Sequence, residues 1–140
     1  MNENIDRSVW INYFDEFTRR NHSRRTRLEV FGQNGAQVEE CGLPFAGINL
    51  ERGNGAPSIE IMLGNHDPAQ SRHLTHVVGN VRNITPKRAL DGRDEALAIV
   101  DVEGETSLLR FEPKPGEWSF CKSPFSFLSS ITLPSPSVDG

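Results

Sequence analysis

The amino-acid sequence predicts an α+β fold, in which one N-terminal amphipathic helix packs on a curved antiparallel sheet, or on a small barrel, of about six or seven strands. The chain of 140 residues has the length of one domain, and its 36% hydrophobic and 24% charged content is that of a globular protein. Its apolar residues recur first at helical spacing and then in short runs between Gly, Asn and Pro. A domain of this size buries roughly two thirds of the surface that its unfolded chain exposes, so a core can form without a metal or a disulfide.

The helix is predicted by four aromatic residues at the i, i+3, i+4, i+7 spacing of one helix face, namely Trp10, Tyr13, Phe14 and Phe17. This spacing places the helix at about residues 7 to 21. Asp6 or Ser8 can cap its first turn, and Arg19 and Arg20 suit its last turn, where cations complement the helix dipole. A helix of this length is marginal alone, so its aromatic face must pack on the remainder of the fold.

The strands are predicted by short apolar or alternating runs that turn residues separate. Asn34-Gly35 favours a hairpin turn because both residues tolerate positive φ, and Asn54-Gly55 and Asp91-Gly92 mark further turns. The extended segments, in chain order, are residues 28–30, 36–41, 46–50, 59–63, 74–78, 81–85, 97–102 and 106–111.

The last two segments are predicted to pair across a two-residue turn at Glu103-Gly104. Ile99 then faces Leu108 on one side of the sheet, and Ala98 faces Leu109 on the other. Both faces of this pair are largely apolar, which indicates either a central pair under the helix or a sheet curled into a barrel.

The end of the chain has a different composition from the rest. Of the last 22 residues seven are Ser, and only Lys122 and Asp139 are charged, but five large apolar residues stand between Phe125 and Leu133. We therefore divide the chain into a single domain of residues 1–111 and a Ser/Pro-rich apolar extension of residues 112–140. The extension is either an added strand or a partly disordered end.

Charge and composition exclude several classes of protein. Fifteen basic and 19 acidic residues give a net charge of −4, which argues against attraction of the whole protein to nucleic acid or anionic lipid. No run approaches the roughly 18 apolar residues of a membrane span, and the first residues lack the features of a signal peptide. We therefore expect a cytoplasmic protein whose two cysteines, Cys41 and Cys121, are free thiols.

Several short motifs are spread over residues 8–111. They include the aromatic helix that ends in Arg19-Arg20, and the runs Leu28-Glu29-Val30, Ile59-Glu60-Ile61-Met62-Leu63-Gly64, Thr75-His76 and Leu108-Leu109-Arg110-Phe111. With these motifs the sequence resembles a family of small prokaryotic proteins catalogued only as a domain of unknown function. The resemblance implies no activity, substrate or catalytic residue. Residues 22–26 are more basic than the family pattern, and the chain after residue 111 lies outside the resemblance.

A small-ligand or metal site is one hypothesis, because His66, Asp67, His73 and His76 lie in one short span and imidazole with carboxylate can ligate zinc or iron. On a strand His73 and His76 point to opposite faces, and a histidine at the core edge, bonded to a neighbour, is the commoner outcome for His76. The candidate residues for such a ligand or metal site are His66, His73, His76 and Glu60. We predict no resident metal or cofactor.

A nucleic-acid patch is a second hypothesis, carried by five arginines within nine residues: Arg19, Arg20, Arg24, Arg25 and Arg27. An arginine surface that is solvated or paired with acids is the more frequent outcome. For nucleophilic catalysis Cys41 with His76 is the one pair worth naming, and a structural thiol is favoured over it. We therefore predict no catalytic residue.

The function predicted from the sequence is a non-catalytic module that binds a protein partner or a second copy of itself. One alternative is a small-ligand binder or an enzyme with a pocket near His73 and His76. A further alternative is binding of nucleic acid through the arginine patch, which the acidic charge disfavours. A membrane partner is not expected.

Overall fold

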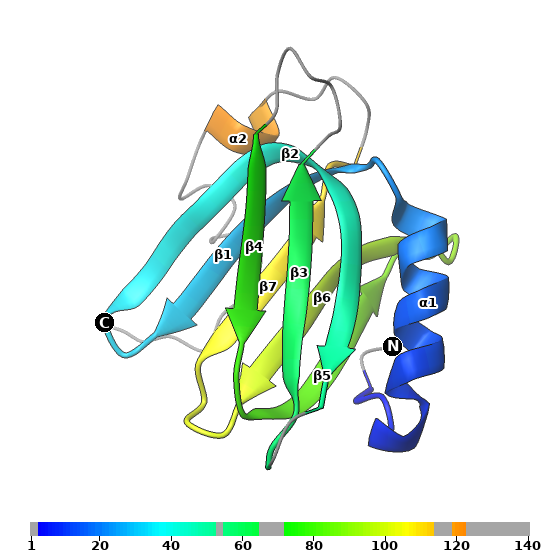
Figure 1. Cartoon of the computed structure of the whole chain (residues 1–140). Coiled ribbons are helices and arrows are strands. Elements are labelled where there is room, and N and C mark those ends of the chain that lie inside the picture. Colours follow the sequence, from blue (N-terminus) through cyan, green and yellow to red (C-terminus); the bar gives the residue numbers. More distant parts are fainter. Residues whose placement is uncertain (1–2, 53–54, 65–71, 114–118, 123–140) are drawn as a thin grey trace.

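The computed structural model describes residues 3–52, 55–64, 72–113 and 119–122 (Figure 1). Its helical elements are a 3-10 turn η1 (Arg7–Val9), the helix α1 (Trp10–Asn21) and one short helix α2 (Ser119–Lys122). Its strands are β1 (Arg25–Gly32), β2 (Gly35–Glu51), β3 (Ser58–Gly64), β4 (His73–Val78), β5 (Val81–Arg88), β6 (Asp94–Asp101) and β7 (Thr106–Phe111).

The predicted helix is confirmed, with its aromatic face in the core. Asp6 caps the preceding 3-10 turn by accepting a hydrogen bond from the amide of Ser8 at 2.9 Å. Trp10, Phe14 and Phe17 are buried. The centroid of the Phe17 ring lies 5.6 Å from that of Phe45 and 5.7 Å from that of Phe111. The aromatic face of α1 thus packs against both β2, through Phe45, and β7, through Phe111.

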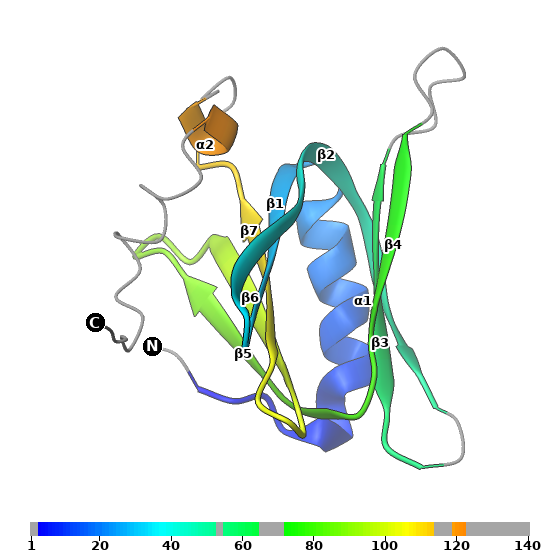
Figure 2. The same ribbon diagram turned by 90° about the vertical axis from the view of Figure 1, so that its left-hand side faces the viewer.

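The seven strands form one antiparallel sheet in the order β4-β3-β2-β1-β7-β6-β5. Strand β2 is 17 residues long, so the two predicted segments 36–41 and 46–50 belong to one continuous strand. Figure 2 shows the sheet folded around α1, with β1, β7, β6 and β5 on one side of the helix and β3 and β4 on the other. The sheet is not closed, because β4 and β5 stand at its two ends. The α+β class is therefore confirmed in its curved-sheet form.

The register of the last hairpin differs from the prediction by one residue. Ala98 pairs with Leu108, and Ile99 pairs with Ser107. The cause is a longer connection, in which the Asp101 carboxylate accepts hydrogen bonds from the amides of Glu103 and Glu105 at 2.9 and 3.0 Å. The two-residue turn that we expected is therefore wrong, but each face of the hairpin keeps apolar residues.

The described residues of the predicted extension are few. They comprise residues 112 and 113, after β7, and helix α2. Residues 114–118 and 123–140 lie outside the described residues, and so does the choice between an added strand and a disordered end. The division of the chain at residue 111 remains a proposal. Among the described residues no helix is long and apolar enough to cross a membrane.

Candidate functional site

The two cysteines are not free thiols. Cys41 and Cys121 form a disulfide that joins β2 to α2, with their α carbons 5.7 Å apart. The prediction of a thiol pair is wrong because 80 residues of sequence separate two positions that the fold brings together. In this form Cys41 cannot serve as a nucleophile for His76, since only a thiolate attacks.

His76 is bonded to a neighbour at the edge of the core, as expected for a structural histidine. Its Nε2 lies 3.1 Å from the Ser107 hydroxyl, across the space between β4 and β7. Burial lowers the pKa of His76, while Glu39 and Glu105 oppose that shift. A serine hydroxyl beside an imidazole can act as a nucleophile with its general base. Ser107 is only 2% exposed, however, so a substrate cannot reach its hydroxyl.

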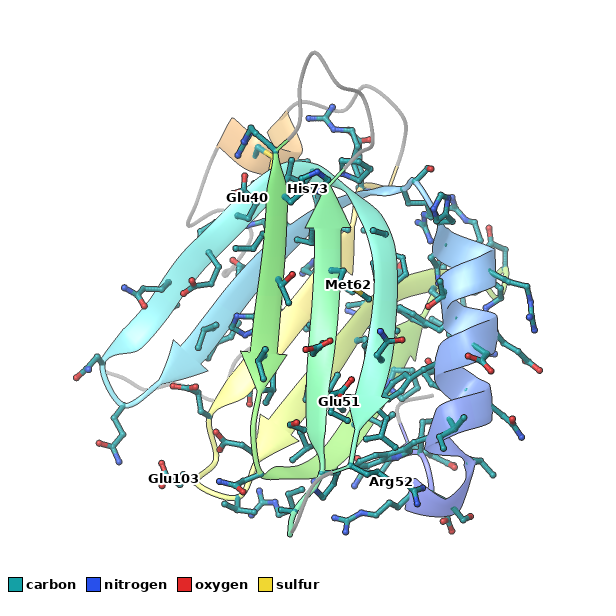
Figure 3. The ribbon with its side chains drawn as sticks, in the orientation of Figure 1. Glu40, Glu51, Arg52, Met62, His73 and Glu103 are labelled. Carbon is teal, nitrogen blue, oxygen red and sulfur yellow. A yellow bond between two sulfur atoms is a disulfide. The ribbon has the colours of Figure 1, made fainter. Side chains whose placement is uncertain are left out.

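The other ligand candidates are not gathered around His76. His73 is exposed at the start of β4, and Figure 3 shows it at the same end of the sheet as Glu40, which pairs with Arg72. Glu60 pairs with Val77 and therefore lies on the face of the sheet opposite to His76, which pairs with Ile61. His66 lies outside the described residues. Among the described residues no group of three His, Cys, Asp or Glu side chains could hold a metal ion.

The five arginines of the basic run do not form one surface. Arg19 is exposed on α1, and Arg20 bonds the Asp94 carboxylate through Nε at 2.9 Å. Arg27 is 1% exposed, and its Nε donates to Glu29 at 3.1 Å. Arg24 and Arg25, unlike Arg19, Arg20 and Arg27, line a cleft.

Arg24 and Arg25 line a cleft of about 430 Å³ at the end of α1. The cleft is bounded by the turn between α1 and β1, by the residue that precedes β6 and by the chain that follows β7. Its lining residues are His22, Ser23, Arg24, Arg25, Arg93, Glu112 and Pro113. Three of the seven are arginines, in a protein whose net charge is −4.

The backbone of the cleft is held by hydrogen bonds to strands on both sides. Ser23 adopts a φ of 73°, which reverses the chain between α1 and β1. Its amide donates to the Phe45 carbonyl at 2.9 Å, and the Phe45 amide donates to the Arg24 carbonyl at 2.7 Å. On the other side the Glu112 amide donates to the Arg25 carbonyl at 2.9 Å. The lining side chains therefore project from a fixed frame.

Asp94 anchors the end of α1 beneath the cleft. Its carboxylate, 2% exposed, accepts hydrogen bonds from Arg20 and from Asn21 at 2.9 and 2.8 Å and lies 3.7 Å from Arg88 Nε. The hydrogen bond to Asp94 raises the pKa of Arg20. The Asp94 charge is thus taken up by two arginines that do not line the cleft.

Of the three cleft arginines, Arg24 has no ion pair with any described residue. Its Nη1 donates to the Asn21 side-chain oxygen at 2.9 Å and to the Asp94 backbone carbonyl at 2.8 Å, and both acceptors are neutral. Its guanidinium lies 4.5 Å from the centroid of the Phe111 ring. Burial and the charge of Arg93 lower the pKa of Arg24, against a smaller opposing effect of Asp94. Among the described residues it forms no ion pair.

The other two cleft arginines are partly neutralised. Arg25 Nη1 lies 3.7 Å from Oε2 of Glu112, a buried oxygen that accepts no hydrogen bond from the described residues. Arg93 Nε donates to Asp91 at 3.1 Å, and its Nη1 donates to the Pro113 carbonyl at 3.5 Å. His22 and Ser23 add polar side-chain atoms to the lining, with His22 Nδ1 and Ser23 Oγ 3.0 Å apart. The arrangement can hold an anion by charge and hydrogen bonds.

Sequence reasoning missed Arg93 and Glu112. Arg93 belongs to the segment Asp91-Gly92-Arg93-Asp94, whose turn at residues 90–92 is confirmed, with Asp91 bonding the Arg93 amide at 3.0 Å. The basic segment 22–26 was the available signal. Nothing in the spacing shows that residues about 70 positions away complete its surroundings.

Comparison with known proteins places the chain in one family. The sequence profile described as "Family of unknown function (DUF5335)" matches residues 1–117, so the chain belongs to that family. The match extends beyond residue 111 and takes in the Glu112 and Pro113 wall of the cleft. No curated protein and no solved structure matches the chain.

Proposed function

We propose that this member of the DUF5335 family binds a small anionic ligand, with a phosphate or carboxylate group, in the cleft at Arg24. The observation that carries the proposal is the half-buried Arg24 guanidinium, which lines the cleft and makes hydrogen bonds only to neutral acceptors among the described residues. The proposal corresponds to the small-ligand alternative of the sequence analysis, moved from the histidines to the end of α1.

Electrostatics favours the binding of an anion in the cleft. Taking a charge out of water costs free energy unless an opposite charge or several hydrogen bonds replace the water. Arg24 lines the cleft together with Arg93, a like charge that lowers the pKa of Arg24, and its guanidinium lies over the Phe111 ring. A phosphate or carboxylate oxygen placed between Arg24 and Arg93 would give both guanidinium groups a charged acceptor, the strongest type of hydrogen bond that arginine makes.

The size of the cleft and the division of the basic run favour a small ligand over nucleic acid. A volume of about 430 Å³ is that of a small-molecule site. A nucleic-acid surface needs several arginines along one face, but Arg20 is bonded to Asp94 and Arg27 is buried. A small phosphate ligand and a nucleic acid both present phosphate groups to arginine, so the experiment must distinguish binding of one from binding of the other.

The test is calorimetric titration of the protein with inorganic phosphate, pyrophosphate, citrate and a short single-stranded oligonucleotide. We expect saturable binding of at least one small anion, weakened about tenfold or more by Arg24→Gln and unchanged by Arg19→Gln, an exposed arginine on α1. Absence of small-anion binding contradicts the proposal. Oligonucleotide binding with a steep salt dependence, weakened equally by both substitutions, would favour the nucleic-acid alternative.

We propose self-association as a second function, because β4 and β5 stand at the ends of the sheet. Unpaired backbone groups on an edge strand can pair with another chain, and Val77 on β4 is 55% exposed. Sedimentation analysis over a range of concentrations tests it. A concentration-dependent dimer that Val77→Lys dissociates supports edge pairing, and a monomer at all concentrations contradicts it.

We further propose a cytoplasmic location, which is the expectation stated in the sequence analysis. In a reducing compartment a disulfide is reversible and usually has a redox role, whereas in an oxidising one it is permanent. Trapping of the thiols with an alkylating reagent in intact cells, followed by measurement of the Cys41–Cys121 linkage, distinguishes the two. Partial reduction supports the cytoplasm, and complete oxidation contradicts it.

A further inference from the structure

We infer that the Cys41–Cys121 disulfide is a site of thiol–disulfide exchange with a dithiol reductant, and that its state sets the anion affinity of the Arg24 cleft. The first part stands by itself, and the second part rests on the proposed function. The arginine that connects the two places is Arg25, which lines the cleft and contacts the backbone next to Cys41.

The disulfide links α2 covalently to β2 of the sheet. Helix α2 has four residues, fewer than an isolated helix needs to be stable in water. A hydrogen bond of 3.1 Å from Arg27 Nη1 to the Phe120 carbonyl also holds α2 against the sheet. Figure 2 shows α2 apart from α1, beyond the β1 and β7 side of the sheet. Reduction therefore removes the only covalent link that α2 makes to β2.

The two cysteines are partly exposed, and the Arg25 guanidinium approaches the same stretch of backbone. Cys41 and Cys121 are both half-buried, so a thiol reagent can approach them. A β carbon placed on Gly42 would lie 3.2 Å from Arg25 Nη2 and 3.9 Å from Cys121 Sγ, so the guanidinium and the sulfur both approach Gly42. A guanidinium near a cysteine favours its thiolate, and a thiolate of lower pKa is the better leaving group in exchange.

The exchange needs no group beyond a dithiol. A thiolate of the reductant attacks one sulfur of the pair, the sulfur–sulfur bond breaks, and the other cysteine leaves as a thiolate stabilised by Arg25. The second thiol of the reductant then attacks the mixed disulfide and releases the remaining cysteine. The reductant is oxidised to its disulfide and two electrons pass to the protein. One of the two protons of the reductant ends on the cysteine farther from Arg25, and the other goes to solvent, because the cysteine nearer to Arg25 stays a thiolate.

Arg25 couples this exchange to the cleft. In the oxidised protein Arg25 Nε donates to the Gly42 carbonyl at 3.3 Å, and its Nη1 lies 3.7 Å from Glu112. After reduction a thiolate becomes a third negative or polar partner for the same guanidinium. Because a cation already neutralised attracts a ligand less strongly, we expect the reduced protein to bind the anion more weakly.

The first experiment measures the rate at which dithiothreitol reduces the disulfide in the folded protein. Arg25→Gln is expected to slow the reaction about fivefold or more, and Arg19→Gln, the matched control, is expected to leave it unchanged. Circular dichroism checks that both variants remain folded. Equal rates for Arg25→Gln and wild type, or a disulfide that only denatured protein exchanges, would overturn the exchange site.

The second experiment measures the affinity for inorganic phosphate in the oxidised protein, the reduced protein and the Cys41→Ser/Cys121→Ser variant. We expect the reduced protein to bind phosphate about fivefold or more weakly than the oxidised protein, and the double serine variant, which has no thiolate, to bind it as the oxidised protein does. Equal affinity in all three would refute the coupling while leaving phosphate binding intact. If the oxidised protein does not bind phosphate, the proposed function and the coupling both fail, and the exchange rate alone decides the first part.

Discussion

Arg24 and Arg27 stand three positions apart, yet the fold treats their charges in opposite ways. Arg27 is fully buried beside Glu29, and both side chains of this pair are 1% exposed. Arg24 is half-buried and bonds only neutral oxygens among the described residues. The comparison teaches that burial alone does not identify a binding site. A buried cation that its own chain neutralises is part of the structure, and one that the chain leaves without a charged partner is available to a ligand.

The difference follows from where each arginine falls in the local structure. Arg27 is in the middle of β1, where it pairs with Cys41 on one side and Arg110 on the other, on the face that α2 contacts. Arg24 precedes β1, in the turn that Ser23 reverses, and its side chain lies against Phe111. The turn directs one arginine to the cleft, and the strand directs the other into the protein.

The largest expected effect is loss of the charge that neutralises Arg27. Glu29→Ala should lower the free energy of unfolding by about 3 to 5 kcal/mol at neutral pH, because it leaves a buried guanidinium without its carboxylate. Urea denaturation measures the loss. The double variant Glu29→Ala/Arg27→Met should regain much of it. A loss below about 1 kcal/mol would mean that Arg27 is not neutralised by Glu29.

The disulfide is expected to come next in size. Cys121→Ser should lower the free energy of unfolding by about 2 to 4 kcal/mol relative to the oxidised protein, because the link constrains the unfolded chain over 80 residues. The same denaturation experiment in the presence of a reductant is the control, since wild type and variant should then agree within about 0.5 kcal/mol. A persistent difference under reducing conditions would show that the side chain, and not the link, matters.

Replacement of Arg24 should have a smaller effect on stability than either of these changes. Arg24→Gln loses two hydrogen bonds from a charged donor to neutral acceptors, worth about 1.5 to 3 kcal/mol each. It also removes a half-buried charge that forms no ion pair with the described residues, and this offsets most of the loss. We expect a net change within about 1 kcal/mol. A loss as large as that for Glu29→Ala would make Arg24 a structural residue and would remove the contrast between the two arginines.

The pH dependence of Glu29 gives the finest test of the pair. Burial raises the pKa of Glu29 above its ordinary value of 4.5, although Arg27 and Arg110 oppose that shift. A carboxyl with a raised pKa in the folded state adds stability below its unfolded pKa, and this contribution is lost as the pH rises through the folded value. The stability of wild type relative to Glu29→Gln should therefore fall as the pH rises from about 4 to about 7. A relative stability that rises over this range would reverse the sign and show that Arg27 outweighs burial.

The fold was largely predictable because its signals are local. The aromatic spacing from Trp10 to Phe17 locates α1 within a few residues, and Asn34-Gly35 locates the first hairpin, in which Gly32 pairs with Gly35. The register of the last hairpin was not predictable in the same way, because it depends on the hydrogen bonds that Asp101 makes within the connection.

The candidate site was predictable only in part because its members are distant in the sequence. The basic run identified Arg24 and Arg25, but the bond from Arg24 to Asp94 spans 70 positions, and the disulfide spans 80. The run also includes Arg27, which alternation along β1 places next to Glu29 and away from the cleft. The sequence shows how many arginines and carboxylates the chain has, and only the fold shows which of them form ion pairs.

The most direct test of the central claim is nuclear magnetic resonance of the arginine Nε–H groups during a titration with inorganic phosphate, with signals identified through single arginine variants. The contrast between the two arginines predicts that the Arg24 and Arg93 signals shift and saturate together, at one dissociation constant, while the Arg27 signal stays in place. Signals that do not move, or an Arg27 signal that moves along with Arg24, would contradict the claim that the fold reserves Arg24 for an anion.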